Sequence, residues 1–182
     1  MSWNKISIGQ GQAIIAANAL DPIDRDITIL HTLKKKPVEY YESLPEYMLK
    51  EQVKKTAWIS KLPDGKYPAP FWHRRYYYKM KVHPNQLSKQ EFALLQKYAG
   101  DYVENLHYIM ALLSTKYTLF GRVVIDTDFE KRAQLFKSKM PFGIAYGYAL
   151  FFSTYYPHLL QIGLAYSQGV KEAAEKTLSS FG

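Results

Sequence analysis

The stretch that decides the fold of this chain runs from Met140 to Val170 and reads MPFGIAYGYALFFSTYYPHLLQIGLAYSQGV. These 31 consecutive residues contain no Asp, Glu, Lys or Arg. A helix of ~20 residues crosses a ~30 Å hydrocarbon core, so residues 142–166 are long enough to span a membrane. Several tyrosines, Pro157, His158 and Gln161 keep the hydropathy moderate, so a buried helix of a soluble protein is the alternative. We expect one transmembrane helix within residues 140–170.

The flanks of the stretch predict its orientation. Pro141 is well placed to start a helix. Basic side chains are denser before the stretch than after it, with Lys131, Arg132, Lys137 and Lys139 on one side and Lys171 and Lys176 on the other. By the positive-inside rule, this asymmetry places the N-terminal body on the inner side of the membrane.

Small residues recur along the first half of the stretch. They are Gly143, Ala145, Gly147, Ala149 and Ser153. Spaced four apart, such residues let a second helix approach closely, so we expect this face to pack against a neighbouring membrane helix.

The far half of the stretch holds the features of a membrane boundary. Pro157 cannot donate its backbone hydrogen bond, which predicts a kink near Ser153. Tyr155 and Tyr156 can straddle an interface. We expect His158 to be an interfacial or packing histidine rather than a proton relay.

The composition of the whole chain limits the classes of protein it can belong to. Its 182 residues, a length for one core, carry 24 Lys or Arg, 16 Asp or Glu and no cysteine. Without cysteine there is no disulfide framework, thiol nucleophile or Cys-ligated metal. The first residues resemble neither a signal peptide nor a typical transit peptide, so we expect any import signal to be internal. We divide the chain into a basic extramembrane region at 1–139, the helix at 140–170 and a tail at 171–182.

Capping signals predict that the extramembrane region is mostly helical. The expected helices are Pro22–Leu33 after Asp21, a helix from the Ser43 capping box to about Ile59, six turns from Ser88 to Leu113, and Phe129–Lys139 after Asp126–Asp128. A short strand or turn is expected at Arg122–Ile125. The fold class is therefore mostly α, with one kinked C-terminal transmembrane helix.

A proline-rich connector at 61–87 holds the densest unusual patch. Pro63, Pro68, Pro70 and Pro84 argue against a central strand, so we expect an extended arm. Aromatic and basic side chains alternate in this arm, which comprises Phe71, Trp72, Arg74, Arg75, Tyr76, Tyr77, Tyr78, Lys79 and Lys81. Such a pattern can hold single-stranded nucleic acid, anionic lipid or an acidic partner surface. We favour a partner- or lipid-facing arm and expect no nucleic-acid partner.

No complete catalytic signature is present. Glu104-x-x-His107 has the spacing used in di-iron bundles, but no second such motif accompanies it. Gly9-Gln-Gly11 lacks the third glycine of a dinucleotide fingerprint, and neither a P-loop nor a Gly-x-Ser-x-Gly elbow occurs. We expect no catalytic residue, metal or cofactor, and predict that the chain is not an enzyme.

The basic body and the late span resemble accessory subunits of mitochondrial inner-membrane complexes. Within that class, residues 147–159, GYALFFSTYYPHL, are similar to the span of ATP synthase subunit f, whose helix closes in Tyr-x-His-Leu; Tyr156-Pro-His-Leu159 is the matching piece. The basic tyrosine run Arg74–Lys79 resembles the segment before that span. The resemblance implies a matrix-side body, a bent span and contacts with other subunits.

The function implied by the resemblance is structural. It is a non-catalytic role in assembling the proton-translocating membrane region, with neighbouring subunits and an anionic lipid such as cardiolipin as partners. Two alternatives stay open at the level of sequence. One is an accessory subunit of a respiratory-chain complex, and the other is a soluble, basic, helical nucleic-acid-binding protein.

Overall fold

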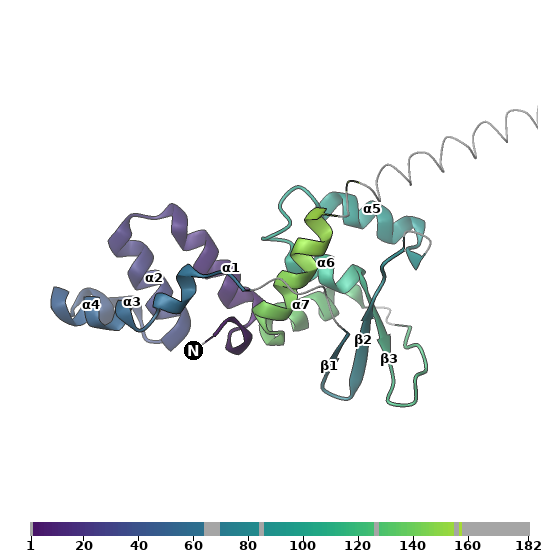
Figure 1. Cartoon of the computed structure of the whole chain (residues 1–182), viewed down its shortest axis with the longest axis horizontal. Coiled ribbons are helices and arrows are strands. Elements are labelled where there is room, and N and C mark those ends of the chain that lie inside the picture. The colour runs from purple at the N-terminus through teal and green to yellow at the C-terminus, as the bar shows by residue number, and fades with distance from the viewer. Residues whose placement is uncertain (1, 64–69, 84–85, 126–127, 155–156, 158–182) are drawn as a thin grey trace, which may run out of the picture.

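The computed structural model describes residues 2–63, 70–83, 86–125, 128–154 and 157 (Figure 1). Most of these residues are helical, and three short strands form one small sheet. The predicted class, mostly α, is confirmed at this level. The molecule is elongated: α2, α3 and α4 form one end, and the sheet with α5, α6 and α7 forms the other (Figure 1).

The N-terminal end is built from short helices. In chain order they are η1 (Trp3–Lys5), α1 (Ile8–Ala16), η2 (Ala17–Ala19), α2 (Pro22–Lys34), α3 (Val38–Glu42), α4 (Glu46–Lys54) and η3 (Ala57–Ser60). The helix expected after Asp21 is confirmed, because α2 begins at Pro22 and ends at Lys34, and the next residue, Lys35, adopts the left-handed conformation. Ile27, Leu30 and Tyr41 form a small second core that holds α2 and α3 together.

The helix expected from Ser43 to Ile59 begins later and ends sooner. Ser43 follows α3, where its hydroxyl donates to the Tyr40 carbonyl at 3.0 Å. Pro45 disfavours helical geometry at the residue before it, so α4 begins only at Glu46. At the other end, the Thr56 hydroxyl donates to the Val53 carbonyl at 2.7 Å, and the chain passes into the 3-10 turn η3.

The predicted extended arm forms part of an antiparallel sheet. Its strands β1 (Phe71–His73), β2 (Tyr76–Met80) and β3 (Ser114–Tyr117) lie in the order β1-β2-β3. The expectation that the proline-rich connector holds no central strand is therefore wrong, because β2 is central. The described prolines Pro63 and Pro70 lie outside the strands, so every residue of β2 keeps the backbone N–H that a ladder needs.

The long helix expected from Ser88 to Leu113 is two helices, α5 (Lys89–Tyr98) and α6 (Leu106–Leu112). The Ser88–Glu91 capping box is confirmed at its start. The break follows from local hydrogen bonds: Asp101 accepts from the Glu104 amide at 3.0 Å, and the Asn105 side chain donates to the Tyr98 carbonyl at 3.4 Å. In such bonds, side-chain groups take the place of the backbone hydrogen bonds that would continue the helix.

The last described helix comes from the charge-free stretch. Asp128 caps α7 (Phe129–Lys139) as predicted, and a further helix covers residues 142–154. Six of its side chains are nearly or fully buried in the main core: Phe142, Ala145, Tyr148, Ala149, Phe151 and Phe152. The described part of this helix therefore packs against the body that precedes it in the chain.

Contacts far apart in sequence hold the 142–154 helix in place. The Trp3 and Phe142 rings lie 5.0 Å apart, and the Phe71 and Tyr148 rings lie 6.1 Å apart. Burial raises the pKa of Tyr148 to about 12, against the opposing effect of the neighbouring Ser114 hydroxyl. None of the helices in the described part of the chain is both long enough and apolar enough to cross a membrane. The tail at 171–182 lies outside the described residues.

Candidate interaction surface

The small residues expected to face another helix lie against the chain's own body. Ala145 and Ala149 are buried in the core, and Gly147 is buried as well. A Cβ added at Gly143 would overlap the Asn4 side chain. The small side chains here permit close packing within one chain, which the spacing alone could not distinguish from packing between chains.

The predicted kink and boundary residues fall at the end of the described chain. Ser153 is exposed, and its hydroxyl donates to the Leu150 carbonyl at 3.0 Å. Pro157 is exposed, while Tyr155, Tyr156 and His158 lie outside the described residues. The kink and the role of His158 stay predictions.

The two-residue period of the strands divides the aromatic-basic segment between two faces. Phe71 and Tyr78 point into the core, where their rings stack 5.1 Å apart. Tyr76 is packed partly against the same core, and the Lys116 ammonium lies 4.1 Å from the centre of its ring. Trp72, the next residue after Phe71, faces outward and is 56% exposed.

Three rings cross the outer face of the sheet. We call Trp72, Tyr77 and Tyr117 the aromatic row. Trp72 pairs with Tyr77 and their rings lie 5.2 Å apart, while the Tyr77 and Tyr117 rings lie 6.3 Å apart. Lys79 is exposed on β2 two residues beyond Tyr77, on the same face. The row therefore presents one aromatic ring from each strand, with a basic residue beside it.

Lys81 does not belong to this surface. Its ammonium lies 2.5 Å from the Glu91 carboxylate, and only 13% of the Lys81 side chain is exposed. Burial raises the pKa of Glu91, but the hydrogen bond from Lys81 and the backbone amide of Ser88 outweigh it, and the net pKa is lowered. Lys81 ties β2 to the capping box of α5, a structural role that the residue pattern did not reveal.

A second hairpin follows β3, and its importance was not predicted from the sequence. The Thr118 amide donates to the Arg122 carbonyl at 2.8 Å, and the Val124 amide donates to the Lys116 carbonyl at 2.8 Å. Gly121, at φ +75°, donates to the Thr118 carbonyl at 3.0 Å and closes the turn. The strand or turn expected at Arg122–Ile125 is thus present as the returning arm.

Exposed apolar side chains lie along this hairpin, at its turn and on its returning arm. We call Leu119, Phe120, Val123 and Ile125 the hydrophobic tip, and they are 70%, 88%, 59% and 88% exposed, respectively. A signal was present in the sequence, since the turn glycine Gly121 directly follows the apolar pair Leu119 and Phe120. Monomeric proteins rarely expose contiguous apolar patches without a function.

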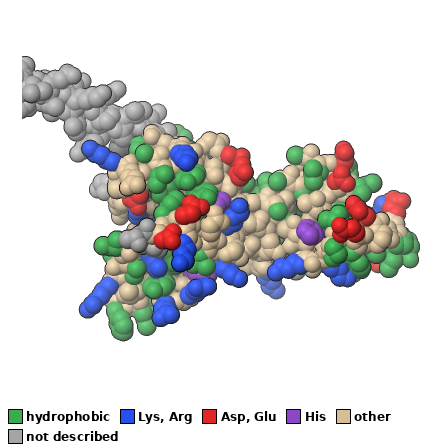
Figure 2. Space-filling model, turned by 180° about the vertical axis from the view of Figure 1, so that it is seen from behind, with side chains coloured by type: hydrophobic (Ala, Val, Ile, Leu, Met, Phe, Trp, Pro, Cys, Tyr) green, Lys and Arg blue, Asp and Glu red, His purple; other side chains and the backbone are tan. Residues whose placement is uncertain are grey.

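The strands and turns that carry the aromatic row and the tip are rich in basic residues, although Lys116 pairs with Tyr78 and so lies on the core-facing side of the sheet. Residues 72–79 and 114–125 contain no Asp or Glu and five basic residues, namely Arg74, Arg75, Lys79, Lys116 and Arg122. Figure 2 shows basic side chains beside hydrophobic ones at the lower left, where the sheet ends. Aromatic, aliphatic and cationic groups thus meet on one rigid sheet, which we call the interaction surface.

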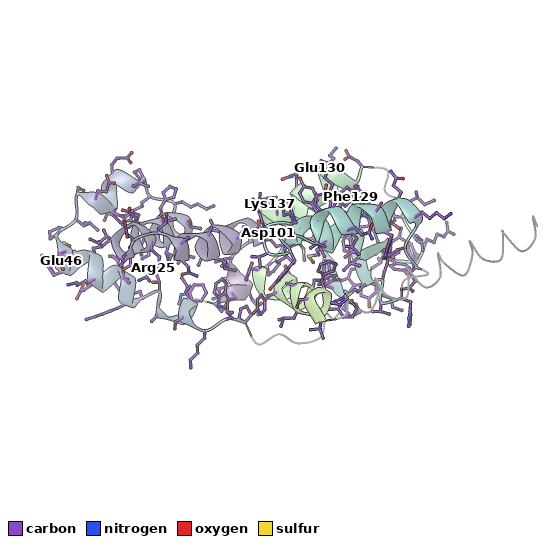
Figure 3. All side chains as sticks on the ribbon, turned by 90° about the horizontal axis from the view of Figure 1, so that it is seen from above. Arg25, Glu46, Asp101, Phe129, Glu130 and Lys137 are labelled. Atoms are coloured by element: carbon purple, nitrogen blue, oxygen red, sulfur yellow. The ribbon has the colours of Figure 1, made fainter. Side chains whose placement is uncertain are left out.

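A polar cluster lies under α1, away from this surface. His107 is almost fully buried, and the Gln12 side-chain nitrogen lies 3.4 Å from its Nδ1 while donating to the Val103 carbonyl at 2.9 Å. Burial lowers the pKa of His107 to about 4, with Lys137 of α7 acting in the same direction (Figure 3). A neutral, buried histidine is typical of a packed core.

Glu104 and His107 lie in different surroundings. Glu104 is exposed, whereas His107 is enclosed by the core. Within the described ranges, no group of three or more His, Asp or Glu side chains is placed to hold a metal ion.

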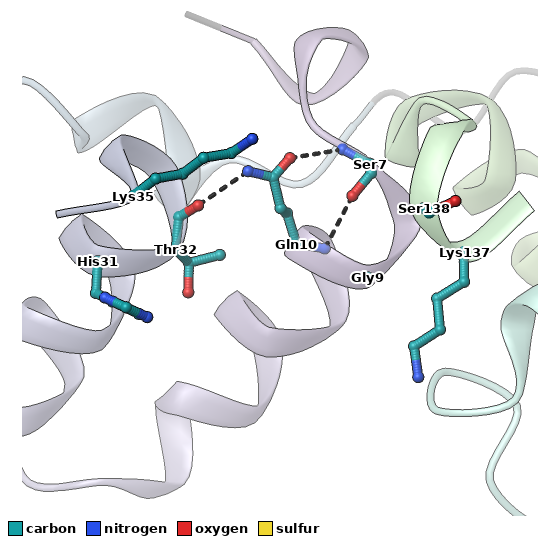
Figure 4. A pocket seen from close by; sticks show the side chains of 8 residues that line it. All are labelled: Ser7, Gly9, Gln10, His31, Thr32, Lys35, Lys137 and Ser138. Carbon is teal, nitrogen blue, oxygen red and sulfur yellow. Dashed lines mark hydrogen bonds between the residues drawn. The ribbon is translucent and has the colours of Figure 1, made fainter. Parts of the chain in front are cut away.

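An open cleft of about 530 Å³ lies between α1, α2 and α7 (Figure 4). It is lined by Ser7, Gly9, Gln10, His31, Thr32, Lys35, Lys137 and Ser138. The Gln10 side chain at its centre accepts from the Ser7 amide and donates to the Thr32 carbonyl at 2.9 Å. These bonds join α1 to α2, so the cleft is a packing seam with lysines at its rim.

Comparisons with protein-family models, curated proteins and solved structures found no match for this chain. The functional argument therefore depends on the interaction surface and on the sequence resemblance of residues 147–159.

Proposed function

We propose that this chain is a non-catalytic accessory subunit of a mitochondrial inner-membrane complex, in the class that includes ATP synthase subunit f. The observation that carries the proposal is the aromatic row, which exposes Trp72 on a hydrogen-bonded sheet together with basic residues. Trp, Tyr and Arg are the residues that dominate the binding energy of protein interfaces. The exposure of such residues on a hydrogen-bonded sheet favours a role in binding.

The parent complex follows from the resemblance of residues 147–159 to the subunit f span. Our first assignment is a structural subunit of the ATP synthase membrane region. In this assignment, a matrix-side body supports assembly of the proton-translocating part. An accessory subunit of a respiratory-chain complex is the alternative, because the same surface would serve it equally well.

A nucleic-acid-binding protein is the second candidate function. Exposed rings on a sheet, with Arg74, Arg75 and Lys79 nearby, are the elements of a stacking platform for single strands. The hydrophobic tip favours the first candidate, since the aliphatic side chains of Leu119 and Ile125 offer no flat face for a base. Binding of a protein or a membrane uses these side chains directly.

The experiment that tests the proposal is purification of the tagged chain from mild-detergent extracts, followed by native electrophoresis and mass spectrometry. We expect the chain to resist carbonate extraction and to migrate with the subunits of one inner-membrane complex. A chain that is monomeric without detergent would contradict the proposal. Tight RNA binding at ~0.15 M salt that is lost on neutralising Arg74 and Arg75 would move the second candidate to the front.

A further inference from the structure

We propose that the hydrophobic tip is a membrane-contact site, at which Leu119 and Phe120 insert into the headgroup region of an anionic bilayer. The basic residues of the two adjoining hairpins bind the lipid phosphates around it. The identity of the membrane rests on the proposed function, whereas the contact itself rests on the geometry of the sheet.

The pairing of β2 with β3 brings the two hairpin turns to the same end of the sheet. Tyr77 pairs with Tyr117, the last residue of β3, so Arg75, which precedes β2, and Leu119, which follows β3, both lie beyond this pair at the same end of the sheet. Neighbouring strands lie ~4.8 Å apart. Figure 1 shows both turns pointing in the same direction, away from the helices. Arg74 and Arg75 therefore lie at the same end of the sheet as the turn of the tip.

The tip cannot fold back into the core without losing its own hydrogen bonds. Three backbone bonds hold the second hairpin: Thr118 to Arg122, Val124 to Lys116, and Gly121 to Thr118. Phe120, inside this hairpin, and Ile125, directly after it, are both 88% exposed. The hydrogen-bonded hairpin thus exposes the apolar side chains to the solvent, as insertion into a membrane requires.

The first hairpin places a basic residue where the backbone disfavours it. Arg74 has φ +55°, a left-handed conformation that glycine adopts without strain and arginine does not. Strained residues of this kind cluster at functional sites. We infer that this exposed arginine, at the same end of the sheet as the tip, binds lipid phosphates.

Charge complementarity selects an anionic bilayer as the occupant. The hairpin residues 72–79 and 114–125 carry five basic and no acidic side chains. Apolar groups ringed by Lys and Arg lie ~5–10 Å into the headgroup boundary of such membranes. A nucleic acid would satisfy the arginines but leave Leu119 and Ile125 in water, and a protein partner is an outcome of the test below.

The test uses the absence of cysteine from the chain. A single Phe120→Cys variant of the full chain carries an environment-sensitive fluorophore, and an Ile23→Cys variant is the matched control. Ile23 is 67% exposed on α2, at the opposite end of the molecule (Figure 1). With phosphatidylcholine vesicles containing cardiolipin, we expect a blue shift at position 120 and none at position 23. Vesicles of phosphatidylcholine alone should give a much smaller shift.

Unlabelled variants separate the contribution of the basic residues to vesicle binding from that of the apolar side chains. Replacing Arg74, Arg75 and Arg122 together by Gln should weaken vesicle binding roughly 100-fold at low salt. Replacing Leu119 and Phe120 by Ser should weaken it roughly tenfold or more, because burial of the two side chains is lost. Ile23→Ser should bind as the unchanged protein does.

Equal fluorophore responses at both positions, or vesicle binding that the tip substitutions leave unchanged, would overturn the assignment. A label at position 120 that responds to the purified complex but not to vesicles would do the same, and would assign the tip to a protein partner. If the label responds to vesicles but the chain joins no membrane complex, the contact site holds and the proposed function fails. If the chain joins a membrane complex but the label does not respond to vesicles, the contact site is rejected and the proposed function holds.

Discussion

At the scale of single residues, burial of His107 makes stability depend on pH. Its folded-state pKa of about 4 lies below the unfolded value of 6.5, so the unfolded chain binds more protons between these values. Stability should therefore be fully present above pH 6.5 and fall as the pH drops toward 4, by on the order of 1–3 kcal/mol. Thermal unfolding between pH 4.5 and 7 measures this effect, at about 2–4 °C for each kcal/mol.

The variant His107→Gln isolates the histidine's share of this dependence. Glutamine cannot titrate, so the slope between pH 4.5 and 6.5 should flatten, although the variant is less stable overall. His83→Gln is the control, because His83 is exposed in the folded protein. An unchanged slope in the His107 variant would show that other groups cause the loss.

At the scale of elements, the 142–154 helix approaches α1 so closely that no side chain fits between them. A Cβ added at Gly11 would overlap the Phe142 ring, which is fully buried. Gly11→Ala should therefore lower the free energy of unfolding by about 1–3 kcal/mol, although alanine favours helices in general. Chemical denaturation measures the change. Gly100→Ala is the matched control, because no atom lies within 4 Å of the added Cβ and stability should hold or rise slightly.

If Gly11→Ala is as stable as the unchanged protein, the 142–154 helix does not pack on α1. That result would return the charge-free stretch to a separate span, as its composition first indicated.

At the scale of the whole molecule, we expect assembly into the parent complex to depend more on the aromatic row than on the basic residues. Trp72→Ala should weaken assembly into the parent complex by about 2 kcal/mol, roughly 30-fold, while Lys79→Ala should change it little. Both residues are exposed, so neither substitution should unfold the body. Quantitative co-purification at two salt concentrations measures the effect. A larger loss with Lys79→Ala would indicate an electrostatic contact instead.

Lys81 is unsuited to this comparison, although the sequence places it in the same basic segment. Lys81→Ala leaves the half-buried Glu91 carboxylate without its cation. A loss of assembly in that variant would report damage to the fold rather than to the interaction surface.

Several elements could be predicted from the sequence alone because their causes are local. Pro22 after Asp21, the Ser88–Glu91 box and Asp128 each act on backbone groups within four residues, so the starts of α2, α5 and α7 were correctly predicted. The break after Tyr98 was not predicted, although its cause is also local. The apolar spacing continues across the break, whereas the Asp101 side chain interrupts the backbone hydrogen bonds of the helix.

Tertiary structure decided the rest of the fold and the candidate surface. The sequence alone determined a mostly helical, basic chain without cysteine and with one charge-free stretch. Whether that stretch packs on its own body depends on Gly11 and Phe71, which lie more than seventy residues before the side chains they touch. Likewise, only the pairing of β2 with β3 brings Arg75 and Leu119 to the same end of the sheet. Burial and strand register depend on partners distant in the chain, and no local pattern encodes which partner will be met.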